Sequence, residues 1–190
     1  MTDLWAFDFD GTLVETATLK REAFFEIFPE TCADAVASVM ARYPDGSRHD
    51  VIPRMVAQAG DDTLDAKTLV AAYGARVAKQ VRQAPALPGA QQALEWAAER
   101  GTVCLFSMTP HDELVTAITA RGWDRYFTDI KGFPAQKPIT LDTWIARFAP
   151  GAVTVIGDGE SDEHAAHHAD ARFLRADPGW PQMLMQGVKS

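Results

Sequence analysis

An apolar run near the N-terminus leads directly into two aspartates, and this combination restricts how the chain can fold. Leu4 to Phe7 is predicted to form a buried strand. Asp8 and Asp10 follow it, and their spacing lets both carboxylates project to the same side of the chain. A helix cap and a turn could each account for one aspartate, but the pair followed by Gly-Thr favours a functional site. Because unpaired charges there are costly, we expect the aspartates to face a metal ion, a cationic partner or both.

Helix and strand patterns alternate from about residue 90 to residue 174. The expected helices are 90–100, 109–122, 140–148 and 161–169, and the expected strands are 102–106, 126–130, 152–156 and 171–174. Strands separated by helices are typical of a parallel sheet that is covered by helices on both faces. The predicted fold class is therefore α/β, with a three-layer α/β/α core.

The segment 15–87 has no strand pattern, and its apolar residues recur at helical spacing. A capping box at Thr31-Cys32-Ala33-Asp34 is expected to begin one helix, and Pro53 is expected in the first turn of another. We interpret the segment as a helical insert after the first strand, which a stiff linker at 84–89 closes. The predicted domains are 1–14 with 88–190, and 15–87.

Composition narrows the classes of protein. The 190 residues, 47% of them hydrophobic, suit one globular domain or a core with a smaller insert. A net charge of −8 argues against a general nucleic-acid or anionic-membrane surface. Cys32 and Cys104 are expected to be buried thiols, which suits a reducing compartment. Without a signal-peptide pattern or a bilayer-length apolar run, we expect a soluble, cytoplasmic protein with no nucleic-acid or membrane partner. Residues 177–190 are expected to form an irregular tail or a short closing helix.

Ligands of such sheets bind beyond the carboxyl ends of the strands, so the residues at these ends carry functional information. After the strand 102–106, Ser107 supplies a hydroxyl group. Thr109 is expected to cap the next helix, whose free N–H groups could also bind an oxyanion or a phosphate. Capping alone would explain Thr109 equally well.

The strand 152–156 is followed by two more acidic residues, Asp158 and Asp162, near the start of a helix. Such a pair alone would more often be helix caps. Together with the acidic pair near the N-terminus, it favours a Mg²⁺ site, because this ion prefers oxygen ligands. Lys137, in an expected loop, would offset part of the negative charge.

These pieces together closely resemble the haloacid dehalogenase superfamily of phosphohydrolases. The four motifs of the superfamily match, in order, Asp8-Phe9-Asp10-Gly11-Thr12-Leu13, Ser107, Lys137-Pro138, and Gly157-Asp158 with Asp162. The first motif is fairly specific alone, and the ordered set is highly specific. The match covers the whole Rossmann-like core, and the helical insert lies where the family has its C1-type cap. The pattern is similar to phosphoglycolate-phosphatase-type members.

The resemblance implies roles for the matched residues. Asp8 would be the nucleophile that forms an aspartyl-phosphate, and Asp10 would be the general acid and then the base. The implied Mg²⁺ ligands are the carboxylates of Asp8 and Asp158, the backbone carbonyl of Asp10, and Asp162 directly or through water. The implied phosphate-binding groups are Ser107, the Met108 N–H and Lys137.

The insert would select the substrate. The stretch Gly46-Ser47-Arg48-His49-Asp50 resembles the cap loop that brings an arginine over the active site in sugar-phosphate members. Arg48 could contact a second anionic group or a hydroxyl of the substrate, or it could be a solvated loop residue. Lys20 and Arg21 are weaker candidates. Hinges are expected at 14–16 and 84–88.

Two further features have weaker signals. His164 and His168 are spaced for a zinc site on one helix, beside His167, but no third ligand of the right type is visible nearby, so a zinc site is not favoured. Glu160 could lie close to the metal, and an exposed position is favoured.

The leading interpretation is a Mg²⁺-dependent phosphatase that acts on a small phosphorylated metabolite. A sugar phosphomutase, an intramolecular phosphotransferase with the same nucleophile, has the Arg48 loop in its favour, although mutase relatives often carry Glu-Asp in place of Gly157-Asp158. A dehalogenase is disfavoured because Asp10 would have no role in it. A non-enzymatic phospho-receiver would have no helical insert after the first strand and would not need an acid at Asp10. A catalytically inactive binding protein would be expected to lack one of the core residues, and none is missing.

Overall fold

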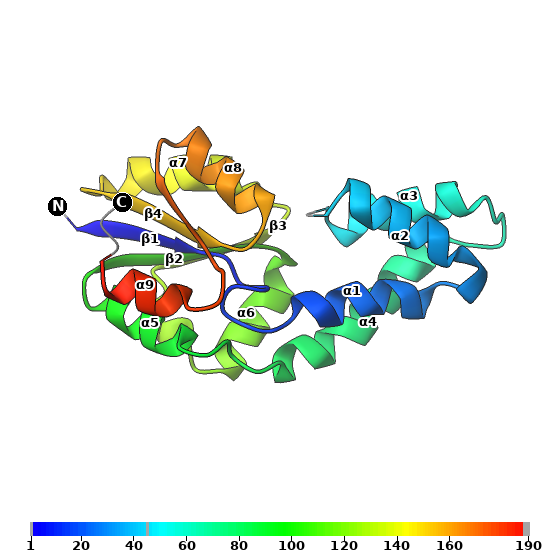
Figure 1. The fold of residues 1–190 in the computed structure, drawn as a ribbon, viewed down its shortest axis with the longest axis horizontal. Coiled ribbons are helices and arrows are strands. Elements are labelled where there is room, and N and C mark those ends of the chain that lie inside the picture. The colour runs from blue at the N-terminus through cyan, green and yellow to red at the C-terminus, as the bar shows by residue number, and fades with distance from the viewer. Residues whose placement is uncertain (1, 45, 188–190) are drawn as a thin grey trace. The chain divides into compact units, whose positions relative to one another are not determined.

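The computed structural model describes residues 2–44 and 46–187; residues 188–190 of the expected tail lie outside the described residues. The chain forms two compact units. One contains the residues up to Glu15 together with those from Ala84 onward, and the other is Thr16–Gln83. The first unit holds a sheet and the second holds only helices among its described residues (Figure 1).

Five parallel strands form the sheet of the first unit in the part of the chain that the structure describes, in the order β3-β2-β1-β4-β5. They are β1 (Asp3–Phe7), β2 (Gly101–Pro110), β3 (Asp129–Phe133), β4 (Val153–Gly157) and β5 (Arg172–Arg175). β1 is central, because it pairs with β2 on one side and β4 on the other. The predicted α/β class with a parallel sheet is confirmed.

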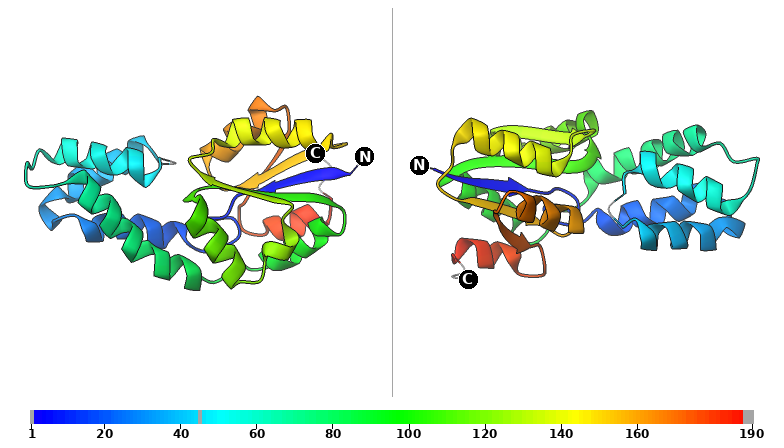
Figure 2. Two further views of the ribbon diagram at one scale, coloured as in Figure 1. Left: turned by 180° about the vertical axis from the view of Figure 1, so that it is seen from behind. Right: turned by 90° about the horizontal axis from the view of Figure 1, so that it is seen from above.

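Helices cover both faces of this sheet, as Figures 1 and 2 show. α5 (Ala90–Ala98), α6 (His111–Ala120) and α9 (Trp180–Met185) lie on one face, and α7 (Lys137–Phe148) and α8 (Glu160–His168) lie on the other. The buried side chains of Leu4 and Ala6 pack under α7 and α8. Phe7 points the other way, and its ring lies 6.0 Å from that of Trp180 on α9. β1 is therefore covered on both faces, which explains its continuous apolar sequence.

The second unit consists of α1 (Ala17–Ile27), the short 3₁₀ helix η1 (Glu30–Cys32), α2 (Ala33–Arg42), α3 (Arg48–Ala59) and α4 (Ala66–Gln83). α1 packs along α4, where the rings of Phe24 and Tyr73 stack with their centroids 4.4 Å apart. α2 packs on α3, and α3 packs on α4. The insert thus buries apolar side chains of its own.

The chain leaves the sheet after β1 and returns before α5 through two segments that pair with each other. The N–H of Leu87 donates to the carbonyl of Leu13, and the N–H of Glu15 donates to the carbonyl of Pro85, both at 3.0 Å. The expected linker is therefore held by backbone hydrogen bonds to the segment that follows β1.

The predicted end of the second strand was wrong. β2 continues to Pro110, and α6 begins only at His111, without a side-chain cap. Thr109 lies within the strand, because its hydroxyl donates to Asp10 at 2.7 Å rather than accepting from a helix N–H group. The expected cap by Thr109 does not form.

Other predicted boundaries also shift. β3 begins at Asp129, three residues after its expected start, because residues 124–126 form a 3₁₀ turn (η2, Asp124–Tyr126). In this turn the Tyr126 hydroxyl donates to Glu95 at 2.7 Å. Lys137 was expected in a loop but is the first residue of α7, where Pro138 suits the first turn.

Two expectations for the insert were wrong as well. The capping box at 31–34 does not form, because η1 takes up Thr31 and Cys32 precedes α2 with no side-chain cap. Pro53 lies beyond the first turn of α3, because backbone bonds to the Ser47 carbonyl already start that helix at Arg48.

Both cysteines are buried free thiols, as predicted. No helix in residues 2–44 and 46–187 combines the length and apolar character needed to cross a membrane. Part of the expected C-terminal tail is helical, since α9 covers the sheet there.

Trp144 on α7 offers a test of the packing under α7. It is 1% exposed, its ring lies 5.7 Å from that of Phe106, and its indole N–H donates to Asp129 at 2.9 Å. Trp144→Ala should lower the free energy of unfolding by about 3–5 kcal/mol, and Trp144→Phe by about 1–3 kcal/mol because Asp129 loses one donor. Urea unfolding measures both. The control Val115→Ala, at an exposed site, should change stability by less than about 0.5 kcal/mol; a similar loss in all three variants would contradict this account.

Candidate active site

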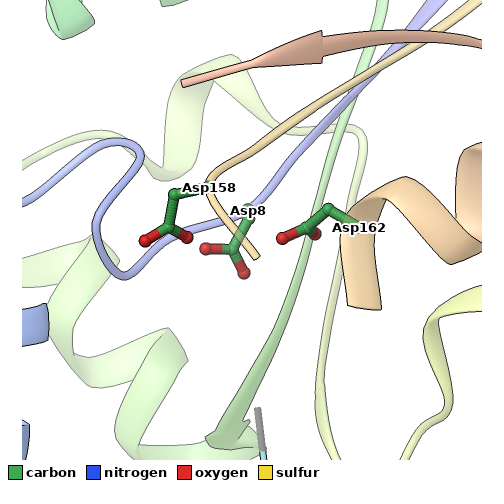
Figure 3. Close-up of side chains that lie close together, drawn as sticks. All are labelled: Asp8, Asp158 and Asp162. Atoms are coloured by element: carbon green, nitrogen blue, oxygen red, sulfur yellow. The ribbon is translucent and has the colours of Figure 1, made fainter. Parts of the chain in front are cut away.

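Three carboxylates meet at the carboxyl ends of β1 and β4. Asp8 directly follows β1, Asp158 directly follows β4, and Asp162 lies in the first turn of α8. One oxygen from each carboxylate lies within 4.8 Å of the others. Figure 3 shows the three side chains in a row with Asp8 in the middle. Asp8 and Asp162 are buried, whereas Asp158 is exposed.

Two glycines allow this close approach. A Cβ on Gly11 would lie 2.1 Å from the Oδ2 atom of Asp158, and Gly11 has a φ of 75°, which disfavours other residues. A Cβ on Gly157 would lie 2.2 Å from the Cγ atom of Asp162. The backbone therefore passes so near to both carboxylates that no side chain fits at either position. Arg175 of β5, which the sequence did not single out, donates to the Asp158 carbonyl at 2.9 Å.

Lys137 supplies the buried cation of the site. Its Nζ atom lies 2.9 Å from Asp8 Oδ1 and 2.7 Å from Asp162 Oδ1, and all three side chains are almost completely buried. Burial alone would lower the pKa of Lys137, but the two carboxylates outweigh it and raise the pKa above its ordinary value. The ammonium therefore stays charged, and it links α7 to β1 and α8.

The acidic residues outnumber this cation. Burial, opposed in part by Lys137 and reinforced by Asp162 and Asp10, raises the pKa of Asp8 to about 7. Partial desolvation of the Asp158 carboxylate and the charge of Asp8 raise the pKa of Asp158 to about 6, and burial raises the pKa of Asp162. The site thus carries an excess of negative charge that a divalent cation would offset. Its donors are all carboxylate oxygens, which fit a hard cation such as Mg²⁺.

Asp10 has a different environment from Asp8. Its Oδ2 atom accepts from the hydroxyls of Ser107 at 3.1 Å and Thr109 at 2.7 Å. Asp8 instead lies against Lys137 and accepts, at 3.4 Å, from the hydroxyl of Thr12. The carboxylate of Asp10 is not a member of the three-carboxylate cluster; its backbone carbonyl remains a proposed ligand only.

Thr109 is a residue of this site that the sequence interpretation missed. It was assigned to a helix cap, although the spacing of 107 and 109 would place both side chains on one side of a continuing strand. The prediction of a helix N-terminus beside Met108 is also wrong, because α6 begins three residues later, at His111. Ser107 and Met108 lie in β2, at an irregularity of its pairing with β3 between Phe106 and Pro110.

Arg48, Lys20 and Arg21 all belong to the helical unit, Thr16–Gln83. The guanidinium of Arg48 lies 5.8 Å from the ring centre of Tyr73 on α4. A Cβ on the neighbouring Gly74 would come within 3.2 Å of Arg48 Nη1. A glycine within a long helix costs stability, and here it leaves room for the arginine.

The other acidic and histidine candidates lie on the surface. Glu160 is exposed, as favoured. His164 and His168 are also exposed, and His168 lies 2.9 Å from Asp142. Within residues 2–44 and 46–187, the histidines are not part of a metal-ligand cluster.

A comparison with protein families decides the affiliation of the chain. The model of a hydrolase family, haloacid dehalogenase-like hydrolase, matches residues 2–170. The chain belongs to the haloacid dehalogenase-like hydrolases. A search of curated proteins gave no significant match.

Solved structures with the same fold carry the names of enzymes that catalyse different reactions. A predicted β-phosphoglucomutase from Thermotoga maritima is 18% identical, with a TM-score of 0.70 over 97% of each chain. A predicted phosphoglycolate phosphatase from Haemophilus somnus is 20% identical, with a TM-score of 0.72 over 90% of this chain and 84% of that one. A 2-haloacid dehalogenase from Pseudomonas syringae is 20% identical, with a TM-score of 0.58 over 92% and 86%. The reaction must therefore be argued from the site.

The buried ion pairs of this haloacid dehalogenase-like hydrolase predict a pH-dependent effect of removing Lys137. The pKa of Asp8 is about 7 in the folded state and 3.8 ordinarily, so the folded state binds more protons between these values and loses stability as the pH rises through them. Lys137→Met leaves Asp8 and Asp162 without their cation. We expect a loss of about 3–5 kcal/mol at pH 8 and a much smaller loss at pH 5, which lies below the pKa of about 7 of Asp8.

Urea unfolding at both pH values, without divalent metal, measures this loss. Lys131→Met, at a half-exposed pair with Asp129, is the control and should cost less than about 1 kcal/mol at either pH. An equal loss at pH 5 and pH 8 would mean that Lys137 acts through the packing of its methylene groups rather than its charge.

Proposed function

We propose that the chain is a Mg²⁺-dependent phosphatase that hydrolyses a small phosphorylated metabolite through an aspartyl-phosphate. The observation that carries this proposal is the different surroundings of two carboxylates only two residues apart. Asp8 lies beside a buried cation and two other acids, which suits a nucleophile next to a metal. Asp10 lies beside two hydroxyls, which suits a group that gives and takes a proton.

The proposed Mg²⁺ ligands are the carboxylates of Asp8, Asp158 and Asp162, together with the backbone carbonyl of Asp10. When bound, the ion would supply positive charge to the site and so offset the charge of a phosphoryl group. The pKa values of Asp8 and Asp158, raised to about 7 and 6, support this assignment, because a bound cation would favour their charged forms.

The proposed reaction has two steps. In the first, Asp8 attacks phosphorus, the bond to the leaving oxygen breaks, and Asp10 gives its proton to that oxygen. In the second, water attacks phosphorus while Asp10 takes its proton, and the Asp8–phosphorus bond breaks to release phosphate. Ser107, the Met108 N–H and Lys137 are the proposed contacts of the phosphoryl oxygens, and Lys137 would also reduce the repulsion between phosphate and Asp8.

The insert at 15–87 is the proposed cap, with hinges at 14–16 and 84–88. Arg48 is the proposed contact to a second polar group of the substrate. Its support is the preformed position of the guanidinium beside Tyr73 and Gly74, which lowers the entropy cost of using it. The buried thiols Cys32 and Cys104 support a reducing compartment, and we propose the cytoplasm.

The central test replaces the proposed nucleophile. We expect the wild-type protein to release phosphate from at least one member of a panel of phosphorylated metabolites with Mg²⁺ and not with EDTA. Asp8→Asn should lower this rate at least about 1,000-fold, because the amide is a poor nucleophile. Phosphate release measures the activity, and ³¹P NMR of the same samples detects isomerised sugar phosphates, which would identify a mutase instead.

Asp142→Asn, at an exposed pair with His168, is the matched control and should leave the activity unchanged. Equal phosphate release by wild type and Asp8→Asn would contradict the assignment of the nucleophile.

A second test concerns the cap. Arg48→Ala should raise KM for the best substrate of the panel by about 10-fold or more, because a charge-assisted contact is lost. It should change kcat/KM for p-nitrophenyl phosphate less than about threefold, because that substrate has neither a second anionic group nor a hydroxyl group. Steady-state kinetics on both substrates measure the difference. The control is Arg54→Ala, because Arg54 is also an arginine of α3 but is exposed and lies against Tyr43. Equal losses of activity on both substrates in Arg48→Ala would contradict a role of Arg48 in specificity.

A further inference from the structure

Ser107 and Thr109 form a hydrogen-bond network with Asp10. The backbone N–H of Thr109 donates to Ser107 Oγ at 3.0 Å, so Ser107 uses its own proton toward Asp10 Oδ2 at 3.1 Å. The Thr109 hydroxyl donates to the same Oδ2 atom at 2.7 Å. Both side chains are buried, with 2% and 5% of their surface exposed. Hydrogen bonds of buried groups to a carboxylate are stronger than those in water, so the network holds the carboxyl group.

The backbone of β2 is arranged to place these hydroxyls. Alternate residues of a strand face the same side, so its continuation to Pro110 puts 107 and 109 together. The irregular pairing with β3 brings this segment close to Gly132, where a Cβ would lie 2.5 Å from the Thr109 carbonyl. Gly132 therefore makes room for the path of the strand that presents Thr109.

Ser107 faces two demands in the proposed phosphatase reaction. Its hydroxyl has one proton, which it now gives to Asp10, and the same proton is needed for a phosphoryl oxygen. When the Ser107 hydroxyl donates to phosphate instead, the Thr109 hydroxyl can still donate to Asp10, at 2.7 Å.

We propose that Thr109 is the positioning residue of Asp10, and that it holds this carboxyl group while Ser107 binds the phosphoryl group. The inference rests on the proposed function. Because the hydroxyls donate to Oδ2, the transferable proton of a neutral Asp10 resides on Oδ1. In the first step this proton moves from Oδ1 to the leaving oxygen as its bond to phosphorus breaks and the bond from Asp8 forms. Asp10 is left as a carboxylate, and in the second step it recovers the proton from water.

The test compares three phosphate esters of similar shape whose leaving groups need a proton to different degrees: p-nitrophenyl, phenyl and benzyl phosphate. Single-turnover release of the alcohol or phenol, with Mg²⁺, isolates the first step. Thr109→Val should slow benzyl alcohol release by about 10- to 100-fold, because part of the general-acid contribution is lost, and nitrophenol release less than about threefold. Thr109→Ser, which keeps the hydroxyl, should restore benzyl alcohol release to within about threefold of wild type.

Thr116→Val is the matched control, because Thr116 is exposed on the neighbouring α6 and its hydroxyl donates to the backbone carbonyl of Asp112 at 2.7 Å. It should leave all three rates unchanged. Thr109→Ala removes the same hydroxyl if the valine variant fails to fold, and thermal unfolding confirms that each variant is native.

The outcomes separate the two proposals. Equal slowing of all three esters by the Thr109 variants, or no rescue by serine, would overturn the positioning role while leaving the phosphatase in place. A wild-type protein that releases none of the three leaving groups, and no phosphate from the metabolite panel, would overturn the proposed function and this inference with it.

Discussion

The buried ammonium of Lys137 is the interaction on which the rest of the site depends. It lies between two buried carboxylates, at 2.9 Å from Asp8 and 2.7 Å from Asp162. Without it, β1 and α8 would bring like charges together in a region with little water, at a cost of several kcal/mol. The same contact ties the first residue of α7 to β1 and α8, because Lys137 begins that helix. One cation therefore joins three elements that are distant in the sequence, and it does not fully balance the acids around it.

The short segment after β1 separates two kinds of carboxyl group within three residues. Asp8 lies among charges, where its pKa depends on burial and on its neighbours. Asp10 lies among hydroxyls, which hold one of its oxygens. In many enzymes, two neighbouring carboxyl groups with different surroundings have different roles in acid–base chemistry. Here the separation depends on β2, which supplies both hydroxyls, as much as on the segment that carries the acids.

The sequence predicted the sheet, its order of helices and strands, and the residues that meet at the strand ends, because apolar periodicity and carboxylate spacing are local signals. It did not predict the roles that depend on contacts distant in the sequence. Thr109 resembled a helix cap, since its partner Asp10 is far away along the chain. Lys137 resembled a loop residue, because a lysine is rarely buried without partners. Its partners, Asp8 and Asp162, are distant in the sequence and so give no local signal. Arg175 had no sequence signal, because it acts through the backbone of Asp158.

The central place of β1 in the sheet has a consequence for synthesis of the chain. Both neighbours of β1 lie far beyond it in the sequence, since β2 starts at Gly101 and β4 at Val153. During translation β1 and its aspartates remain without strand partners until more than half of the polypeptide has been made. The helices of 16–83 depend on nearer contacts, which form sooner. The segment that interrupts the sheet in sequence is thus complete before the sheet can form, and the most apolar strand must wait longest, which exposes it to aggregation and to chaperones.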